Sequence, residues 1–112
     1  MKRLIQELVL TKYIGGLIMV TRIQSVHFDA SQQLMEFVEK KVAKLEKLCE
    51  DATSLDVAMK LIKPESAQNK EVALRLCCGA GELFASKTSD TFEDALLVAI
   101  DAIKVQIEKK QR

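Results

Sequence analysis

Alternation of apolar and polar residues along the chain predicts four β-strands. Residues 20–28 are rich in β-branched side chains and alternate in part, whereas residues 55–62 and 70–78 alternate more strictly. A shorter segment, residues 82–87, follows the sequence GAG, in which glycine tolerates the backbone angles of a tight turn. Because successive side chains of a strand point to opposite faces of a sheet, each segment is expected to bury one face.

Two longer segments have the apolar spacing of amphipathic helices. Residues 30–49 carry one apolar stripe, and a second stripe runs through the segment that closes the chain. The first stripe comprises Leu34, Phe37, Val38, Val42, Leu45, Leu48 and Cys49, and the second comprises Phe92, Leu96, Ala99, Ile100, Ile103 and Ile107. Asp29 and Asp90 each precede a helix and have a polar partner three residues later, so we expect them to cap the two helices.

The resulting order of elements is β-α-β-β-β-α, without internal repeats or linkers. This order predicts an α+β domain of two layers, in which two helices pack on one face of a four-stranded sheet. The other face of the sheet is expected to be solvated or used for binding. A chain of 112 residues, of which 48% are apolar, has the size and composition to form one such domain.

The first eighteen residues differ from the rest of the chain. A basic start followed by an apolar run resembles a signal peptide, but Glu7 and Lys12 interrupt the run, which is too short to span a membrane. One helical face collects the apolar side chains of Leu4, Ile5, Leu8, Val9 and Tyr13, and two glycines would end that helix. We therefore expect residues 1–18 to be an N-terminal extension, helical or not native, and residues 19–112 to form the domain.

The few chemically reactive residues argue against catalysis. The chain has one histidine, His27, and three cysteines without a C-x-x-C pair, which disfavours a metal site, a disulfide framework and a catalytic triad. The GAG turn lacks the lysine and the hydroxyl residue of a phosphate-binding loop. We therefore expect a protein that is not an enzyme, holds no cofactor, binds no membrane and keeps its thiols reduced in the cytoplasm.

Two groups of basic residues are candidates for binding an anion. Lys40, Lys44 and Lys47 line one face of the first helix, with Lys41 beside them. The second group, near the end of the chain, comprises Lys104, Lys109, Lys110 and Arg112. If the helices pack side by side, both groups could lie on one surface of a chain whose net charge is only +1. The alternative is an ordinary solvated helix surface, stabilised by pairs such as Glu36–Lys40.

A basic first helix and an acidic start to the second helix occur together in the segments FVEKKVAKLEKL and ASKTSDTFEDALLVAIDAIKVQIEK. In this combination they resemble the ribosome hibernation promoting factor family, also called ribosome-associated inhibitors, from Met19 to Arg112. The resemblance implies a fold similar to double-stranded-RNA-binding folds, in the short form of the family that lacks the ribosome-pairing domain. It also implies binding to the small ribosomal subunit and its ribosomal RNA, in the channel where messenger and transfer RNA meet, which blocks translation and preserves idle ribosomes.

The resemblance also assigns candidate RNA-binding residues. The positions that match the basic surface of the family are Lys41, Lys44, Lys47, Lys87 and Lys109, and those that match less closely are Lys40, Lys104, Lys110 and Arg112. Lysines on a rigid helix suit the closely spaced phosphates of folded RNA, which is recognised mostly by shape and backbone.

Three positions in the second helix lead to an alternative function. Leu97 stands where relatives often have an acidic residue, and Val105 stands where a basic one is usual. Val98 and Val105 are seven residues apart, opposite the apolar stripe, so both are expected to face solvent. The alternative is therefore a protein-interaction or dimerisation module with weakened RNA binding, which self-associates through Val98, Val105 or the N-terminal segment.

Overall fold

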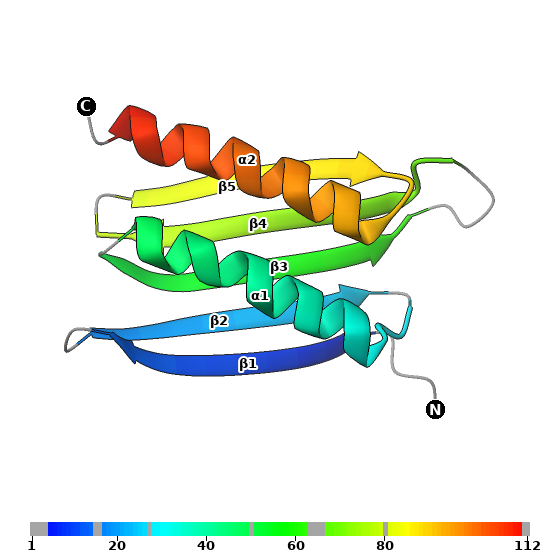
Figure 1. The fold of residues 1–112 in the computed structure, drawn as a ribbon, viewed down its shortest axis with the longest axis horizontal. Coiled ribbons are helices and arrows are strands. Elements are labelled where there is room, and N and C mark those ends of the chain that lie inside the picture. The colour runs from blue at the N-terminus through cyan, green and yellow to red at the C-terminus, as the bar shows by residue number, and fades with distance from the viewer. Residues whose placement is uncertain are drawn as a thin grey trace.

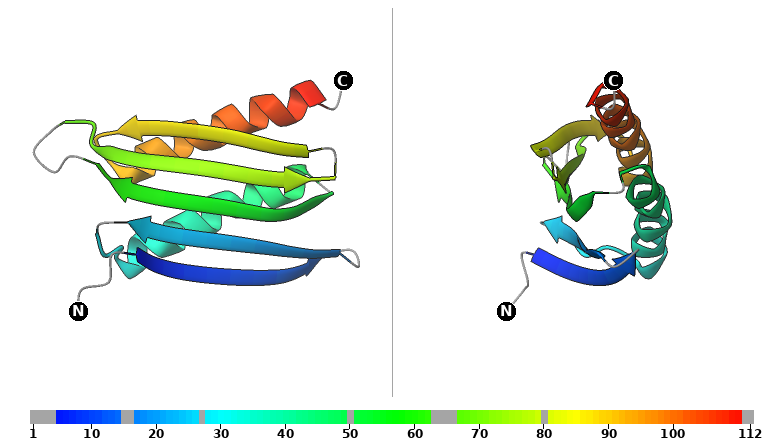
Figure 2. Two further views of the ribbon diagram at one scale, coloured as in Figure 1. Left: turned by 180° about the vertical axis from the view of Figure 1, so that it is seen from behind. Right: turned by 90° about the vertical axis from the view of Figure 1, so that its left-hand side faces the viewer.

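The computed structural model describes residues 5–14, 17–26, 28–49, 51–62, 67–79 and 81–110 of the chain. Seven elements follow one another along it (Figure 1). They are β1 (Ile5–Ile14), β2 (Leu17–Val26), α1 (Gln32–Leu48), β3 (Ala52–Leu61), β4 (Lys70–Cys78), β5 (Gly81–Ser89) and α2 (Phe92–Lys110). Both helices lie on one face of the sheet, and the other face is uncovered (Figure 2). The predicted α+β class and two-layer arrangement are therefore confirmed.

The sheet has five strands in the order β1-β2-β3-β4-β5, one more than predicted. Neighbouring strands are antiparallel except β2 and β3, which are parallel because α1 crosses over between them. The N-termini of α1 and α2 lie at the same end of the sheet, so the helices run in the same direction (Figure 1). The two helices contact each other, and α2 also packs on β4 and β5.

The extra strand corrects the prediction of a helix in the N-terminal segment. β1 pairs along its whole length with β2, from Ile5 opposite Val26 to Ile14 opposite Leu17. Its sequence, IQELVLTKYI, is rich in the β-branched and aromatic residues that favour strands. Leu8 packs against the core of the domain, so β1 is a part of the sheet. The proposed division into residues 1–18 and 19–112 remains a prediction.

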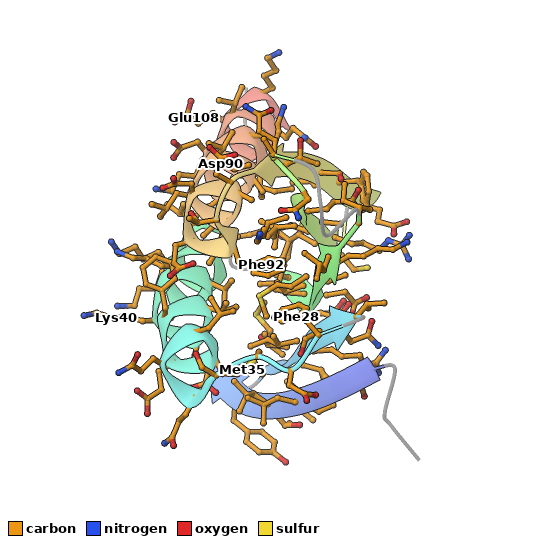
Figure 3. The ribbon with its side chains drawn as sticks, turned by 90° about the vertical axis from the view of Figure 1, so that its right-hand side faces the viewer. Phe28, Met35, Lys40, Asp90, Phe92 and Glu108 are labelled. Atoms are coloured by element: carbon orange, nitrogen blue, oxygen red, sulfur yellow. The ribbon has the colours of Figure 1, made fainter. Side chains whose placement is uncertain are left out.

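The hydrophobic core fills the space between the sheet and the helices. Its fully buried side chains come from β2, β3, β4 and both helices, and the largest include Ile23, Leu55, Leu74, Leu45 and Ile103. Two aromatic rings close one end of this core. Phe28, which follows β2, stacks on Phe92 at the start of α2 with ring centroids 4.3 Å apart (Figure 3).

Both helices begin with a hydroxyl cap, and the caps predicted at Asp29 and Asp90 are wrong. The Ser31 hydroxyl accepts a hydrogen bond from the Leu34 backbone N–H at 3.1 Å, and the Thr91 hydroxyl accepts one from Asp94 at 3.1 Å. Asp90 instead accepts a hydrogen bond from the Gln68 backbone N–H at 2.9 Å. Its carboxylate therefore ties the loop before β4 to the start of α2.

Candidate nucleic-acid interface

The outer face of α1 is basic. Lys40, Lys44 and Lys47 are exposed there, as the helical spacing predicted, while Val38 and Leu45 are buried on the opposite side. Lys40 projects away from the sheet in Figure 3. These three side chains therefore present their charges to solvent on one rigid surface, which we call the α1 basic face.

The two flanks of α1 differ in charge. Lys41 is half-buried, and its ammonium group lies 5.5 Å from the centre of the Phe37 ring in a cation–π contact. The other flank faces β1, where Glu36 and Glu39 line a groove of about 440 Å³ together with Glu7 of β1. The helical repeat places Lys41 and Lys44 on the side away from this groove, toward α2. Positive charge is therefore concentrated on the outer face and the α2-facing flank.

The outer face of α2 is acidic and apolar. Asp94, Asp101 and Glu108 follow one another every seven residues and are all exposed, so they form a carboxylate stripe. Val98 and Val105 are 50% and 48% exposed, which confirms that both face solvent. Leu97 is also exposed. We call this combination of carboxylates and apolar side chains the α2 acidic face.

The basic residues of α2 lie on different flanks. Gln106 donates a hydrogen bond to the Phe84 carbonyl of β5 at 2.8 Å, which marks the flank that covers the sheet edge. Lys109 belongs to this flank, whereas Lys104 is half-buried on the opposite flank, toward α1. The side chain of Lys110 and the whole of Arg112 lie outside the described residues. Of the described basic residues in α2, only Lys104 adjoins the α1 basic face.

Lys87 lies apart from the other candidates. It is opposite Val72 of β4 in the register, so it is on the helix-bearing side of the edge strand β5, and it is exposed. Lys87 is near the end of β5, on the side of the domain where both helices begin, whereas Lys44 and Lys47 are near the opposite end of α1 (Figure 1). The structure therefore brings together the lysines of α1 and Lys104, and leaves Lys87 and Lys109 at the margins.

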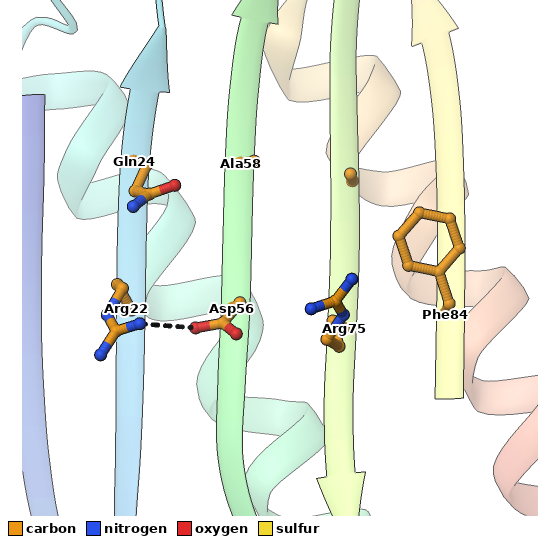
Figure 4. A pocket seen from close by; sticks show the side chains of 7 residues that line it. Arg22, Gln24, Asp56, Ala58, Arg75 and Phe84 are labelled. Atoms are coloured by element: carbon orange, nitrogen blue, oxygen red, sulfur yellow. Dashed lines mark ion pairs between the residues drawn. The ribbon is translucent and has the colours of Figure 1, made fainter. Parts of the chain in front are cut away.

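The uncovered sheet face contains a groove that sequence analysis did not identify. It has a volume of about 270 Å³, and its floor is formed by Ala58 and Ala73, which are opposite each other in β3 and β4 (Figure 4). Arg22 lies 3.9 Å from Asp56, and Arg75 lies 2.7 Å from Glu82. Because each arginine lies next to a carboxylate, the local charge of this face is closer to neutral than that of the α1 basic face, and the face is less suited to RNA phosphates.

The fold and the basic helix define a class: a two-layer α+β domain with cationic side chains on its helical layer. Residues 21–112 match the family model described as "Sigma 54 modulation protein / S30EA ribosomal protein". The chain belongs to this family, which confirms the resemblance to the ribosome hibernation promoting factors. No curated protein sequence matches the chain.

Two solved structures are similar in fold. One is the N-terminal domain of Protein Y from Thermus thermophilus, with a TM-score of 0.64 and 16% identity over 78% of this chain and 91% of that chain. The other is a ribosomal subunit interface protein from Coxiella burnetii, with a TM-score of 0.66 and 18% identity over 83% of this chain and 93% of that chain. Among the described residues, no helix is both long and apolar enough to cross a membrane.

Proposed function

We propose that the protein is a ribosome-associated translation inhibitor of the cytoplasm. It binds the small ribosomal subunit in the channel for messenger and transfer RNA and stabilises idle ribosomes, without catalysing a reaction. Membership of the S30EA family supports this function, as does the likeness in fold to a protein named for the ribosomal subunit interface. The observation that carries the proposal is the α1 basic face, a row of exposed lysines in a chain with a net charge of +1.

The α1 basic face forms the centre of the proposed interface. Lys41 and Lys104 extend it toward the gap between the helices, and the peripheral contacts come from Lys87, Lys109, Lys110 and Arg112. Phosphates of folded ribosomal RNA release counterions when lysines neutralise them, so the affinity depends on salt. Because the positive charge is local, the interaction has to be oriented, with the outer side of the helical layer against the RNA.

Co-sedimentation with ribosomes at two salt concentrations tests this function. The 112-residue protein is expected to pellet with the small subunit at about 50 mM salt and to be largely lost from the pellet at about 200 mM. If the protein contacts six or more phosphates, this increase in salt should lower its affinity for the ribosome by at least about 1,000-fold. Bovine serum albumin serves as a control for trapping in the pellet. Absence of the protein from the pellet at both salt concentrations would contradict the proposal.

A second candidate function is self-association, in which the α1 basic face of one copy meets the α2 acidic face of another. The charges are complementary, and the contact would bury Leu97, Val98 and Val105, which are 40 to 50% exposed in the single chain. A two-fold axis would create this contact twice, since each copy has both faces. Such a dimer would cover the lysines that are proposed to bind RNA.

A charge swap distinguishes this dimer from other forms of self-association. Sedimentation equilibrium is expected to show a mass that increases with concentration. Lys44→Glu/Lys47→Glu and Asp101→Lys/Glu108→Lys should each abolish the increase, and the combined variant should restore it. A mass that increases equally in every variant would point instead to the exposed edge of β1. A monomer at all concentrations would exclude self-association.

A further inference from the structure

Three potential metal ligands from different parts of the chain meet at one end of the sheet. Cys49 caps the C-terminus of α1, Asp51 precedes β3, and Cys78 ends β4. The Sγ atoms of Cys49 and Cys78 are 3.0 Å apart, and the Sγ of Cys49 is 3.1 Å from Oδ1 of Asp51. All three ligand atoms lie within 4.8 Å of one another. Their convergence depends on tertiary structure, because the two cysteines are 29 residues apart.

The cluster lies at the boundary between the core and the solvent. Cys49 is buried, Cys78 is half-buried against the core, and Asp51 is exposed. Gly79 leaves room for the carboxylate, because a Cβ atom there would lie only 3.1 Å from Oδ2 of Asp51. The two sulfur atoms are therefore held by the fold, and an ion could enter past Asp51.

The electrostatic environment of the cluster favours a cation. The C-terminal end of α1 contributes partial negative charge beside Cys49. Burial raises the pKa of the Cys49 thiol to about 12, and its hydrogen bonds to Cys78 and Asp51 act in the same direction. In the absence of a cation, the Cys49 thiolate is therefore disfavoured. A divalent ion would compensate the negative charge of the thiolates and the carboxylate, and would replace the thiol protons.

We propose that Cys49, Asp51 and Cys78 form a binding site for a thiophilic divalent metal ion such as Zn²⁺. Two thiolates select zinc over magnesium or calcium, and a carboxylate oxygen is an accepted third ligand. A tetrahedral site with Zn–S distances of about 2.3 Å separates its sulfurs by roughly 3.8 Å, so the Cys49 and Cys78 side chains need to move apart by less than about 1 Å. Water would occupy the fourth position.

The metal ion would join the last turn of α1 to the adjacent ends of β3 and β4. Lys47 is in that turn, so the ion would also fix one end of the α1 basic face. A disulfide between Cys49 and Cys78 is the competing use of the same thiols. Asp51 favours the metal, because a carboxylate next to two thiols contributes a ligand to a metal ion but forms no part of a disulfide.

Titration of the reduced 112-residue protein with Co²⁺, followed by competition with Zn²⁺, tests the site. One equivalent of Co²⁺ is expected to produce a thiolate-to-cobalt charge-transfer band, and Zn²⁺ should remove it. Cys49→Ser and Cys78→Ser should each weaken binding by at least about 100-fold, and Asp51→Asn by about 10-fold or more. Circular dichroism would verify that each variant is folded.

Cys77→Ser is the matched control. Cys77 is adjacent to Cys78 in β4, but its side chain is on the opposite face of the sheet. This variant is expected to bind Co²⁺ as the wild-type protein does, and Zn²⁺ should protect two of the three thiols from alkylation in the wild-type protein. The proposal would be overturned if no thiolate band appeared, or if Cys77→Ser lost it as completely as Cys49→Ser. A protein that forms the Cys49–Cys78 disulfide but binds no Co²⁺ after reduction would also overturn it.

Discussion

The two helices of this domain have the same structural role and opposite outer surfaces. Each packs an apolar stripe against the same sheet, and each begins with a hydroxyl cap. The α1 basic face presents Lys40, Lys44 and Lys47 to solvent, whereas the α2 acidic face presents carboxylates and valines. The core therefore constrains one side of each helix and leaves the other side free to differ.

This difference makes the proposed RNA interface asymmetric. Phosphates are attracted to the α1 basic face and repelled by the carboxylate stripe of Asp94, Asp101 and Glu108. The net charge of +1 hides this contrast, because charges of opposite sign on neighbouring helices cancel in the sum. Ribosome affinity should therefore depend strongly on the α1 basic face, and weakly or in the opposite sense on the α2 acidic face.

Double charge reversals on each of the two helices are expected to have the largest effect, which is on ribosome affinity. Lys44→Glu/Lys47→Glu should lower ribosome affinity by at least about 10-fold, or roughly 1.4 kcal/mol, because two phosphate contacts become repulsive. Asp101→Lys/Glu108→Lys changes the charge by the same amount in the other direction and should raise affinity. Both can be measured by filter binding with purified small subunits.

A double substitution by uncharged residues separates the effect of lost positive charge on binding from any effect on the stability of the fold. Glutamate near the C-terminus of α1 opposes the helix dipole, so Lys44→Glu/Lys47→Glu also costs some stability. Lys44→Gln/Lys47→Gln avoids that cost and should still weaken binding, by a smaller factor. If both lysine variants bound as tightly as the wild-type protein, the α1 basic face would not be the interface.

Substitution of the two helix caps gives the next largest effect, which is on the free energy of unfolding. It tests whether the two helices contribute equally to the stability of the domain. Ser31→Ala and Thr91→Ala each remove a side-chain acceptor from a helix N-terminus, and each should lower the free energy of unfolding by about 1 kcal/mol. Urea unfolding followed by circular dichroism measures this loss. Asp29→Ala serves as the control and should have a smaller effect, since Ser31 is the cap. A much larger loss in one helix would contradict the equivalence.

The secondary structure was predictable where the spacing of apolar residues fitted either a strand or a helix, but not both. Strict alternation located β4 at residues 70–78, the same range that the structure has. The segment that forms β1 contains three consecutive apolar residues, Leu8, Val9 and Leu10, which fit a helical stripe and a strand equally well. Only pairing with β2 decides between them, and that partner is a property of the tertiary structure.

The candidate sites, too, were predictable where they depend on local sequence spacing and not where they depend on tertiary structure. Lys40, Lys44 and Lys47 were predicted to share a face because spacing within one helix determines it. The proximity of Cys49 and Cys78 depends on the β3–β4 register, which places Ala52 opposite Cys78. The groove on the uncovered face likewise depends on Ala58 being opposite Ala73. Such cross-strand neighbours cannot be derived from local sequence patterns.

A single substitution on α2 should reduce the difference in charge between the α1 basic face and the α2 acidic face. Val105→Lys replaces an exposed apolar side chain with a charge, four residues after Asp101 and three before Glu108. The new lysine can pair with either carboxylate, so stability should be unchanged or slightly increased. Ribosome affinity should rise by about threefold, or roughly 0.65 kcal/mol, because the α2 acidic face loses part of its repulsion. Val105→Gln, which adds no charge, should leave the affinity near that of the wild-type protein.

The smallest expected effect on ribosome affinity comes from a substitution on the flank of α1 that faces α2. Phe37→Leu keeps an apolar contact there but removes the ring beneath Lys41, so it should lower the free energy of unfolding by about 0.5–1 kcal/mol. Ribosome affinity should fall less than twofold, because the Lys41 charge remains, whereas Lys41→Met should lower it further by removing that charge. If Lys41→Met weakened binding as much as Lys44→Glu/Lys47→Glu, the RNA would enter the gap between the helices. The contrast between the outer faces would then matter less than the flanks that α1 and α2 share.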